Sequence, residues 1–242
     1  MTVKSPKPYP PDPFAGFSSM SELSSSLTFD RQRESWINLA LYRGLKWGVV
    51  RPLLHGLFRG QVIGQDQVPL SGPALVVSNH ASYFDPPFLS CAMARPVAFM
   101  AKEELFAVPG LSQAIQLYGA YPVKRGSGDR GALRAAMGAL ARGWLVGIFL
   151  EGTRTQDGRI HHPKLGAAMI AAKAQVPLIP VGLIGVEKIF SQKSALPQLP
   201  PLTIRIGQVI PPPPKSKRSF LGATTQACQA QIHHLLDQGH PR

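Results

Sequence analysis

Short apolar runs alternate with stretches of helical periodicity along most of the chain after residue 70. The apolar runs are rich in aliphatic residues and are short enough to be buried strands. They occupy residues 74–77, 97–100, 145–150, 178–184 and 202–206. Between and after them, the pattern predicts helices over residues 88–94, 131–142, 166–174 and 224–236. Apolar strands that alternate with helices predict an α/β fold, with a mixed, largely parallel central sheet flanked by helices.

A different pattern precedes this region. Residues 36–50 are interrupted only by Arg43 and Lys46 among charged residues, and at helical pitch their apolar side chains run almost all the way round. Pro52 is expected to end this helix or to begin a second one over residues 53–58. We therefore predict an N-terminal apolar helical hairpin that lies in a membrane interface. Its basic residues would face lipid headgroups: Arg43, Lys46, Arg51 and Arg59. A helical lid packed on the main domain is the alternative.

This patterning divides the chain into three regions. Residues 1–28 are rich in proline and serine, lack the apolar segment of a signal peptide, and are expected to be a disordered tail. Residues 29–60 form the apolar, basic helical segment for membrane association, although no window holds the 18 or so uninterrupted apolar residues of a spanning helix. Residues 61–242 form the main domain. Its two cysteines, Cys91 and Cys228, stand far apart, which argues against a zinc site or a disulfide framework.

The charge balance narrows the choice of partners. The chain has 26 Lys and Arg residues against 13 Asp and Glu residues, a net charge of +13. A chain this basic is expected to meet nucleic acid, an anionic membrane surface or a phosphorylated substrate. The sequence has no RNA-recognition aromatic signature, helix-turn-helix pattern or zinc finger, so we expect no nucleic-acid partner.

His80 and Asp85 follow the first apolar run and are the first candidates for chemistry. In sheets of this kind, ligands bind at the carboxyl ends of the strands. If the turn between the two residues curls back, the carboxylate would fix the tautomer of the imidazole and stabilise its protonated form. This is what a general base needs to take a proton from an alcohol. Alternatively, Asp85 caps the next helix ahead of Pro86, and His80 is an ordinary loop residue.

Three further segments are candidates for substrate binding or pocket formation. Residues 151–154 follow another apolar run, and there Gly152 allows close backbone approach while Arg154 and Thr153 offer donors to a phosphate. Residues 119–125 form a short extended segment that ends in Lys124 and Arg125. Residues 176–181 form an apolar strand with two prolines, which can at most shape a pocket. The alternatives for the two polar segments are a solvated turn and a basic surface loop.

Taken together and in this order, these segments resemble the glycerolipid acyltransferase family that includes the 1-acyl-glycerol-3-phosphate acyltransferases. The family's first motif, Asn-His followed by four residues and Asp, is matched by Asn79, His80 and Asp85. Its other three motifs are matched by residues 119–125, 149–154 and 176–181, and the resemblance extends over residues 62–190. One position departs from the family pattern, because Leu150 replaces the usual proline of the third motif. Leucine adds an N–H group that needs a partner, and we expect a modest shift of the loop that follows.

The resemblance implies an enzyme that transfers a fatty acyl group from an acyl thioester, on coenzyme A or acyl carrier protein, to the free hydroxyl of 1-acyl-glycerol-3-phosphate. His80 and Asp85 would be catalytic, with no metal and no cofactor beyond the acyl donor. The substrate-binding residues would be Asn79, Lys102, Arg125, Glu151, Gly152, Thr153 and Arg154. Glu151 would hold Arg154 or the acceptor hydroxyls, while Arg125 and Arg154 would hold the phosphate. The product would be phosphatidic acid, made on the cytoplasmic face of a membrane by a peripheral or monotopic protein.

Three other interpretations remain open at this point. The acceptor could be glycerol-3-phosphate or a lyso-aminolipid. The chain could be a basic membrane-binding protein without enzyme activity. His80 and Asp85 could support metal-assisted hydrolysis, although further ligands at useful spacing are missing.

Overall fold

The computed structural model describes residues 36–107, 112, 115, 120–123, 130–141, 143–190 and 198–241. Several predicted features lie wholly or partly outside the described residues: the tail over residues 1–28, the start of the membrane-association segment at residues 29–35, and residues 119, 124 and 125 of the second motif, which include Arg125. Lys102 ends a described strand, but its side chain is also outside that part.

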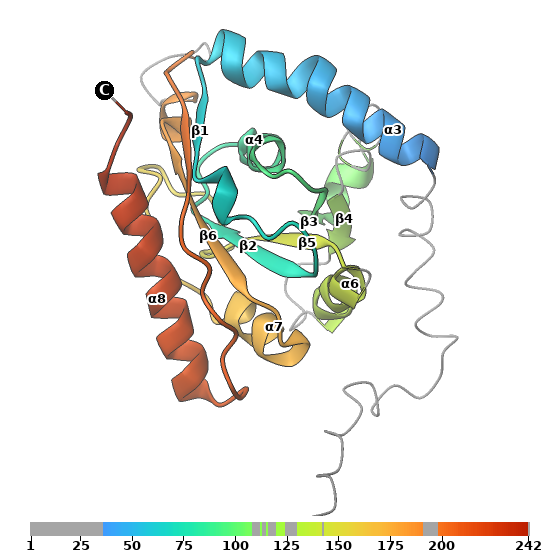
Figure 1. Cartoon of the computed structure of the whole chain (residues 1–242), viewed down its shortest axis with the longest axis vertical. Coiled ribbons are helices and arrows are strands. Elements are labelled where there is room, and N and C mark those ends of the chain that lie inside the picture. Colours follow the sequence, from blue (N-terminus) through green and yellow to red (C-terminus); the bar gives the residue numbers. More distant parts are fainter. Residues whose placement is uncertain are drawn as a thin grey trace, which may run out of the picture.

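A seven-stranded sheet forms the centre of the described structure, in the order β1-β7-β6-β2-β5-β3-β4 (Figure 1). The strands are β1 (Gln61–Ile63), β2 (Ala74–Ser78), β3 (Val97–Lys102), β4 (Ala120–Val123), β5 (Leu145–Phe149), β6 (Leu178–Ile184) and β7 (Thr203–Ile206). All neighbours are parallel except β6 and β7. This confirms the predicted α/β fold with a mixed, largely parallel sheet. The three-residue edge strand β1 was not predicted, because its short and partly exposed segment carries little pattern.

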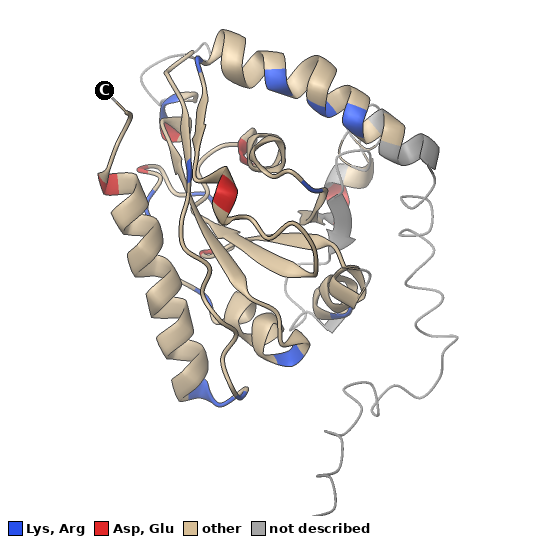
Figure 2. Ribbon diagram, viewed as in Figure 1, with Lys and Arg blue, Asp and Glu red and all other residues tan. Residues whose placement is uncertain are grey.

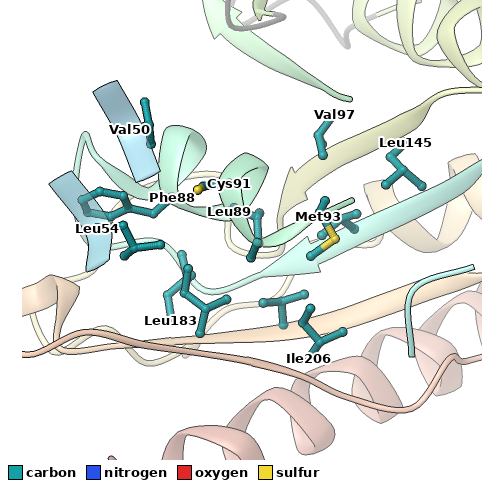
Figure 3. Packing of buried hydrophobic residues seen from close by; sticks show 14 of the residues in the cluster. Val50, Leu54, Phe88, Leu89, Cys91, Met93, Val97, Leu145, Leu183 and Ile206 are labelled. Carbon is teal, nitrogen blue, oxygen red and sulfur yellow. The ribbon is translucent and has the colours of Figure 1, made fainter. Parts of the chain in front are cut away.

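Helices cover both faces of the sheet, and strand β2 shows why. Its side chains alternate between two buried clusters, Ala74 and Val76 on one face, Leu75 and Val77 on the other. The first face is covered by α4 (Asp85–Ala92) and the N-terminal helix, and Figure 3 shows this packing. The second is covered by α6 (Arg130–Ala141), α7 (Gly166–Ala174) and α8 (Arg218–Asp237). A strand buried on both faces explains the uninterrupted apolar runs in the sequence.

The N-terminal segment is one long helix, so the predicted hairpin is wrong. It consists of α3 (Trp36–Leu45) and the π-helical turns η1 (Lys46–Val50) and η2 (Leu53–Leu57). Arg51 and Pro52 both keep right-handed helical backbone angles, so the chain crosses the proline without reversing (Figure 1). Proline lacks the N–H group of an ordinary helical turn, and π-helical turns lie on both sides of it. In the described part of the chain, we find no helix with the length and apolar character needed to cross a membrane.

The inner face of this long helix belongs to the main core. Val50, Leu54 and Phe58 are buried in the same cluster as α4, so the described part of this segment shares the core of the main domain. Two polar contacts reinforce the packing: the Tyr42 hydroxyl bonds to Ser90, and the Lys46 ammonium donates to the carbonyl of Met93. Burial lowers the pKa of Lys46 below its ordinary value. The prediction that Lys46 faces lipid headgroups is therefore wrong. Its ammonium group is buried and bound by the carbonyl of Met93, just after the C-terminal end of α4.

The outer face of the long helix carries exposed apolar and basic side chains. Trp47 is 56% exposed, and Val49 and Leu57 are about as open. The Arg51 guanidinium lies 4.3 Å from the centre of the Trp47 ring. Figure 2 shows basic positions and no acidic position along the described part of this helix. The segment is therefore amphipathic, with a solvent-facing side that combines tryptophan with positive charge.

Candidate active site

The loops that follow β2 and β5 emerge at the same edge of the sheet. The two strands are parallel neighbours, and Ser78 at the end of β2 pairs with Phe149 at the end of β5. His80 follows the first strand by two residues, and Glu151 follows the second by two. The register therefore brings the first and third sequence motifs side by side, at the carboxyl ends where ligands bind in such sheets.

His80 and Asp85 meet through the curled turn between them. His80 Nδ1 lies 2.7 Å from Asp85 Oδ2, and the same oxygen accepts the backbone N–H groups of Ala81 (2.7 Å) and Ser82 (2.8 Å). Asp85 is fully buried, whereas the His80 side chain is 17% exposed. Because the carboxylate occupies Nδ1, Nε2 is the ring nitrogen that can accept a proton from a substrate.

The position of Asp85 at the start of α4 explains its unusual set of partners. Pro86 and Pro87 follow it in the first turn and carry no N–H groups, so the helix itself offers the carboxylate no donor there. The loop supplies Ala81 and Ser82 N–H groups instead, and the N-terminus of α4 favours negative charge at this point. Oδ1 has no hydrogen-bond partner among the described residues. The hydrogen bonds to Oδ2 alone therefore hold the carboxylate in place, and the same oxygen orients His80.

Phe149 completes the surroundings of the imidazole. Its ring stacks on His80 with centroids 3.9 Å apart and planes 11° from parallel, and Phe99 stacks behind it at 6.1 Å. An aromatic face attracts a cation, so this contact strengthens when the imidazole becomes protonated. The sequence identified Phe149 as part of the third motif but did not predict a role for its ring. That role depends on the register of β2 and β5, which brings the ring against His80.

Backbone hydrogen bonds tie the third-motif loop to the first motif. Thr155 N donates to the His80 carbonyl at 2.8 Å, and its hydroxyl lies 3.3 Å from the same oxygen. Leu150 N donates to the Ser78 carbonyl at 2.9 Å. Leucine at this position therefore finds the partner its N–H group needs, in a bond that a proline could not make. The bond joins the loops of the two motifs rather than leaving a polar group unpaired.

The four predicted residues of the third motif lie at this edge with different surroundings. Thr153 and Arg154 are exposed, and Gly152 has a positive φ of 72°, which favours glycine. Arg154 contacts Tyr83, with Nη2 2.8 Å from the phenol oxygen. Glu151 accepts the backbone N–H of His161 at 2.9 Å and so closes its own loop. The described contacts therefore place Arg154 against Tyr83, whereas the family resemblance implied that Glu151 holds either Arg154 or the acceptor hydroxyls.

Lys164 is a further cation at this edge that sequence reasoning did not single out. Its Nζ lies 3.1 Å from the point where a Cβ of Gly152 would stand. Its backbone N–H also donates to the Leu150 carbonyl at 2.8 Å. The available signal was a basic residue two positions before the helix predicted at residues 166–174. In the described residues, no three His, Cys, Asp or Glu side chains are grouped closely enough to hold a metal ion.

Asn79 lies beneath the site with its amide bonded to the protein backbone. Nδ2 donates to the carbonyls of Gly158 (2.7 Å) and Leu183 (2.9 Å), and Oδ1 accepts the N–H of Leu183 at 2.8 Å. The side chain is buried and joins the end of β2 to the end of β6 and to the third-motif loop. This geometry favours a positioning role over direct contact with substrate, since these backbone groups occupy the amide on both sides.

Asn79→Ala is therefore expected to lower stability. The variant leaves three buried backbone groups without their partner, and we expect a loss of about 3 kcal/mol in the free energy of unfolding. Urea unfolding followed by circular dichroism measures this difference. Gln67→Ala removes a surface amide bonded to its neighbour Asp66 and should change stability by less than about 0.5 kcal/mol. Equal stabilities of the two variants would contradict the positioning role.

Comparison with known proteins gives a consistent result. The family model described as Acyltransferase matches residues 59–184, just over half of the chain. A chloroplastic 1-acyl-sn-glycerol-3-phosphate acyltransferase of Brassica napus is 31% identical over 166 residues, which cover 67% of this chain and 46% of the relative. The 1-acyl-sn-glycerol-3-phosphate acyltransferase alpha of Homo sapiens is 31% identical over 143 residues, 58% of this chain and 50% of the relative. The chain thus spans about half the length of the curated relatives it matches.

A solved structure resembles the fold over nearly the whole chain. It is the 1-acyl-sn-glycerophosphate acyltransferase PlsC from Thermotoga maritima, with a TM-score of 0.65. The match covers 92% of this chain and 86% of that one, at 24% sequence identity. At 24% identity, this structural similarity shows that the two proteins share a fold and shows nothing beyond that.

Proposed function

The chain belongs to the acyltransferase family, and from this membership we propose that it transfers a fatty acyl group from an acyl thioester to the free hydroxyl of 1-acyl-glycerol-3-phosphate, making phosphatidic acid. The observation that carries the proposal is the His80–Asp85 pair, held at 2.7 Å at the carboxyl edge of the sheet. The third-motif loop, which bears Arg154, is hydrogen-bonded to the His80 carbonyl beside it. A general base next to a cation suits an acceptor that carries both a hydroxyl and a phosphate.

The transfer proceeds in one displacement at the thioester carbonyl. His80 Nε2 takes the proton of the acceptor hydroxyl while the oxygen attacks the carbonyl carbon. Asp85 keeps Nδ1 protonated and stabilises the imidazolium that forms, and the stacked ring of Phe149 adds to this. When the tetrahedral intermediate collapses, the carbon–sulfur bond breaks and the thiolate receives the proton from His80. The products are the new ester and the free thiol, and the enzyme returns to its starting state without an acyl-enzyme.

A panel of acceptors with one labelled acyl chain tests this function. Purified protein is incubated with acyl-coenzyme A or acyl carrier protein as donor, and the lipid products are separated and identified. The acceptors are 1-acyl-glycerol-3-phosphate, glycerol-3-phosphate, a lyso-aminolipid and a phosphate-free monoacylglycerol. Labelled phosphatidic acid from the first acceptor is the expected result, and the two donors show which carrier is used. Transfer only to another acceptor would refute the proposed substrate while retaining the acyltransferase chemistry.

We further propose that the outer face of the long helix binds an anionic membrane surface on the cytoplasmic side, where the product must go. Trp47, Val49 and Leu57 are exposed on it, and Arg51 lies beside Trp47. An amphipathic helix with tryptophan and basic residues on one side is typical of interfacial binding. Each basic residue near an anionic leaflet contributes about 1 kcal/mol to binding. Because the inner face is part of the core, the protein would rest on the membrane as a peripheral or monotopic domain.

Point substitutions test membrane binding better than deletion of the segment, since deletion would open the core around Leu54. The double variant Trp47→Glu, Leu57→Glu should reduce binding to vesicles containing anionic lipid by about ten-fold or more. Co-sedimentation with such vesicles measures the binding, and thermal unfolding checks the fold. The control is Lys215→Glu, Lys217→Glu, which changes exposed cations before α8, at the end of the molecule away from the long helix. A larger loss in this control would place the membrane-binding surface there instead.

A further inference from the structure

Tyr83 is a large exposed aromatic residue inside the loop that joins His80 to Asp85. Its side chain is 65% exposed. The backbone on either side is held: Ser82 N donates to Asp85 Oδ2, and Phe84 N donates to Ser82 Oγ at 3.2 Å. The Phe84 ring is also stacked on Phe190. The position of Tyr83 is thus set by the same contacts that set the His80–Asp85 pair, while its ring points away from the core.

The Tyr83 ring supports the guanidinium of Arg154. Arg154 Cζ lies 3.6 Å from the ring centre, and Nη2 lies 2.8 Å from the phenol oxygen. The two residues are 71 positions apart in the chain, so only the fold brings them together. Stacking uses the flat face of the guanidinium, whereas its N–H groups lie along the edges. The remaining N–H groups of Arg154 are therefore still able to form a two-point contact with a phosphate.

The backbone places this contact close to the reacting residues. Thr155, the residue after Arg154, donates its N–H to the His80 carbonyl at 2.8 Å. Tyr83 is two residues before Asp85, whose carboxylate orients His80. Tyr83 and Arg154 thus both lie on loops that are hydrogen-bonded directly to His80 or Asp85. A phosphate bound at the edge of Arg154 would lie beside the same loop that holds the general base.

We propose that Tyr83 is a positioning residue for phosphate recognition: it holds the Arg154 guanidinium by its face, so that the edge is oriented for the phosphate of the acceptor before the acceptor arrives. This rests on the proposed function for the identity of that acceptor. An exposed arginine has many rotamers, and ordering it on binding opposes affinity. A preformed stack removes part of this cost in the free enzyme. Tyr83 then affects acceptor binding and phosphate selectivity, while His80 and Asp85 carry out the chemistry.

Steady-state kinetics of Tyr83→Ala and Tyr83→Phe test the proposal. Tyr83→Ala should raise the KM for 1-acyl-glycerol-3-phosphate by about ten-fold, with kcat within about two-fold of wild type. Tyr83→Phe keeps the stacking face and loses only the phenol contact, so its KM should rise by about two-fold to three-fold. Neither variant should alter the KM for a phosphate-free monoacylglycerol. Phe220→Ala removes another exposed aromatic, on α8, and should leave both acceptors unchanged.

The double variant Tyr83→Ala, Arg154→Ala shows whether Tyr83 acts through Arg154. If it does, the KM of the double variant equals that of Arg154→Ala alone, because the stack is already lost. Additive effects would overturn the proposal, as would a Tyr83→Ala variant that lowers kcat and leaves KM unchanged. In the latter case Tyr83 would serve the structure of the His80–Asp85 loop instead.

A measurement without turnover separates this proposal from the proposed function. The Nε–H signal of Arg154 in an NMR spectrum of the ¹⁵N-arginine protein should be shifted by the Tyr83 ring, and Tyr83→Phe should retain that shift while Tyr83→Ala loses it. Titration with glycerol-3-phosphate should move the signal at lower concentration in wild type than in Tyr83→Ala. If wild type fails to acylate 1-acyl-glycerol-3-phosphate but shows this difference, the proposed substrate is wrong and the positioning role stands. Identical titrations in the two proteins would overturn the positioning role.

Discussion

His80→Ala is expected to lower kcat/KM for acyl transfer by about three to four orders of magnitude. A general base contributes about 10²-fold to 10⁴-fold, and here the same imidazole must also return the proton to the departing thiolate. The carboxylate of Asp85 keeps its bonds to Ala81 N and Ser82 N in the variant, so the loop should still fold. The lost side chain is 17% exposed and contacts Asp85 and Phe149 at the site.

The chain offers a matched control for this substitution. His161 and Asp157 form a second His–Asp pair at 2.8 Å, with both side chains about half exposed. His161→Ala keeps the backbone N–H that Glu151 accepts, so the third-motif loop should be preserved. We expect this variant to retain activity within about two-fold to three-fold of wild type. Initial rates with labelled donor, together with the thermal midpoint of each variant, separate catalysis from folding. Comparable losses in the two variants, or an active His80→Ala enzyme, would rule out His80 as the base.

Asp85→Asn is the second substitution with a large expected effect, a loss of about 10³-fold to 10⁴-fold in kcat. The amide has nearly the shape of the carboxylate, and its oxygen can still accept the N–H groups of Ala81 and Ser82. With the amide oxygen in the place of Oδ2, all three hydrogen bonds can persist, but the side chain no longer carries a negative charge. The imidazolium that forms at His80 then lacks its buried counter-charge. The activity is lost through the missing charge, with little change in the fold.

Asp85→Ala should add a loss of stability to the loss of activity. It removes all three bonds of Oδ2 from a fully buried position and leaves two backbone N–H groups without a partner. We expect about 2–4 kcal/mol of destabilisation, compared with less than about 1 kcal/mol for Asp85→Asn. Asp157→Asn is the control at the exposed His161 pair and should leave kcat near the wild-type value. Single-turnover rates and urea unfolding measure the two quantities separately. A fully active Asp85→Asn enzyme would contradict the role proposed for the negative charge of Asp85.

The local pattern of the sequence was sufficient to predict most helices and strands and to identify the candidate catalytic residues. Helix α7 and strand β6 have the predicted bounds, because a continuous apolar run or a helical repeat is a property of neighbouring residues. The five-residue spacing of His80 and Asp85 also contains what a single turn needs to bring them together. The prediction of a helical hairpin was wrong because a proline at position 52 is compatible both with a reversal of the chain and with a continuing helix. The helix continues, and Val50 and Leu54 on it pack in the same core cluster as α4.

Only the tertiary structure decided the contacts that surround the His80–Asp85 pair. The stack of Phe149 on His80, the Asn79–Leu183 bonds and the Tyr83–Arg154 contact join residues that are 69 to 104 positions apart. Such contacts depend on which strands are neighbours and on their register. The hydrophobic periodicity of the sequence predicts neither the strand order nor the register. The sequence by itself therefore determined the α/β fold and the pairing of His80 with Asp85, the proposed general base and its carboxylate, since these follow from short-range spacing. The order of the strands decided which aromatic ring stacks on His80 and which one supports Arg154, because those contacts arise only when distant loops meet at one edge of the sheet.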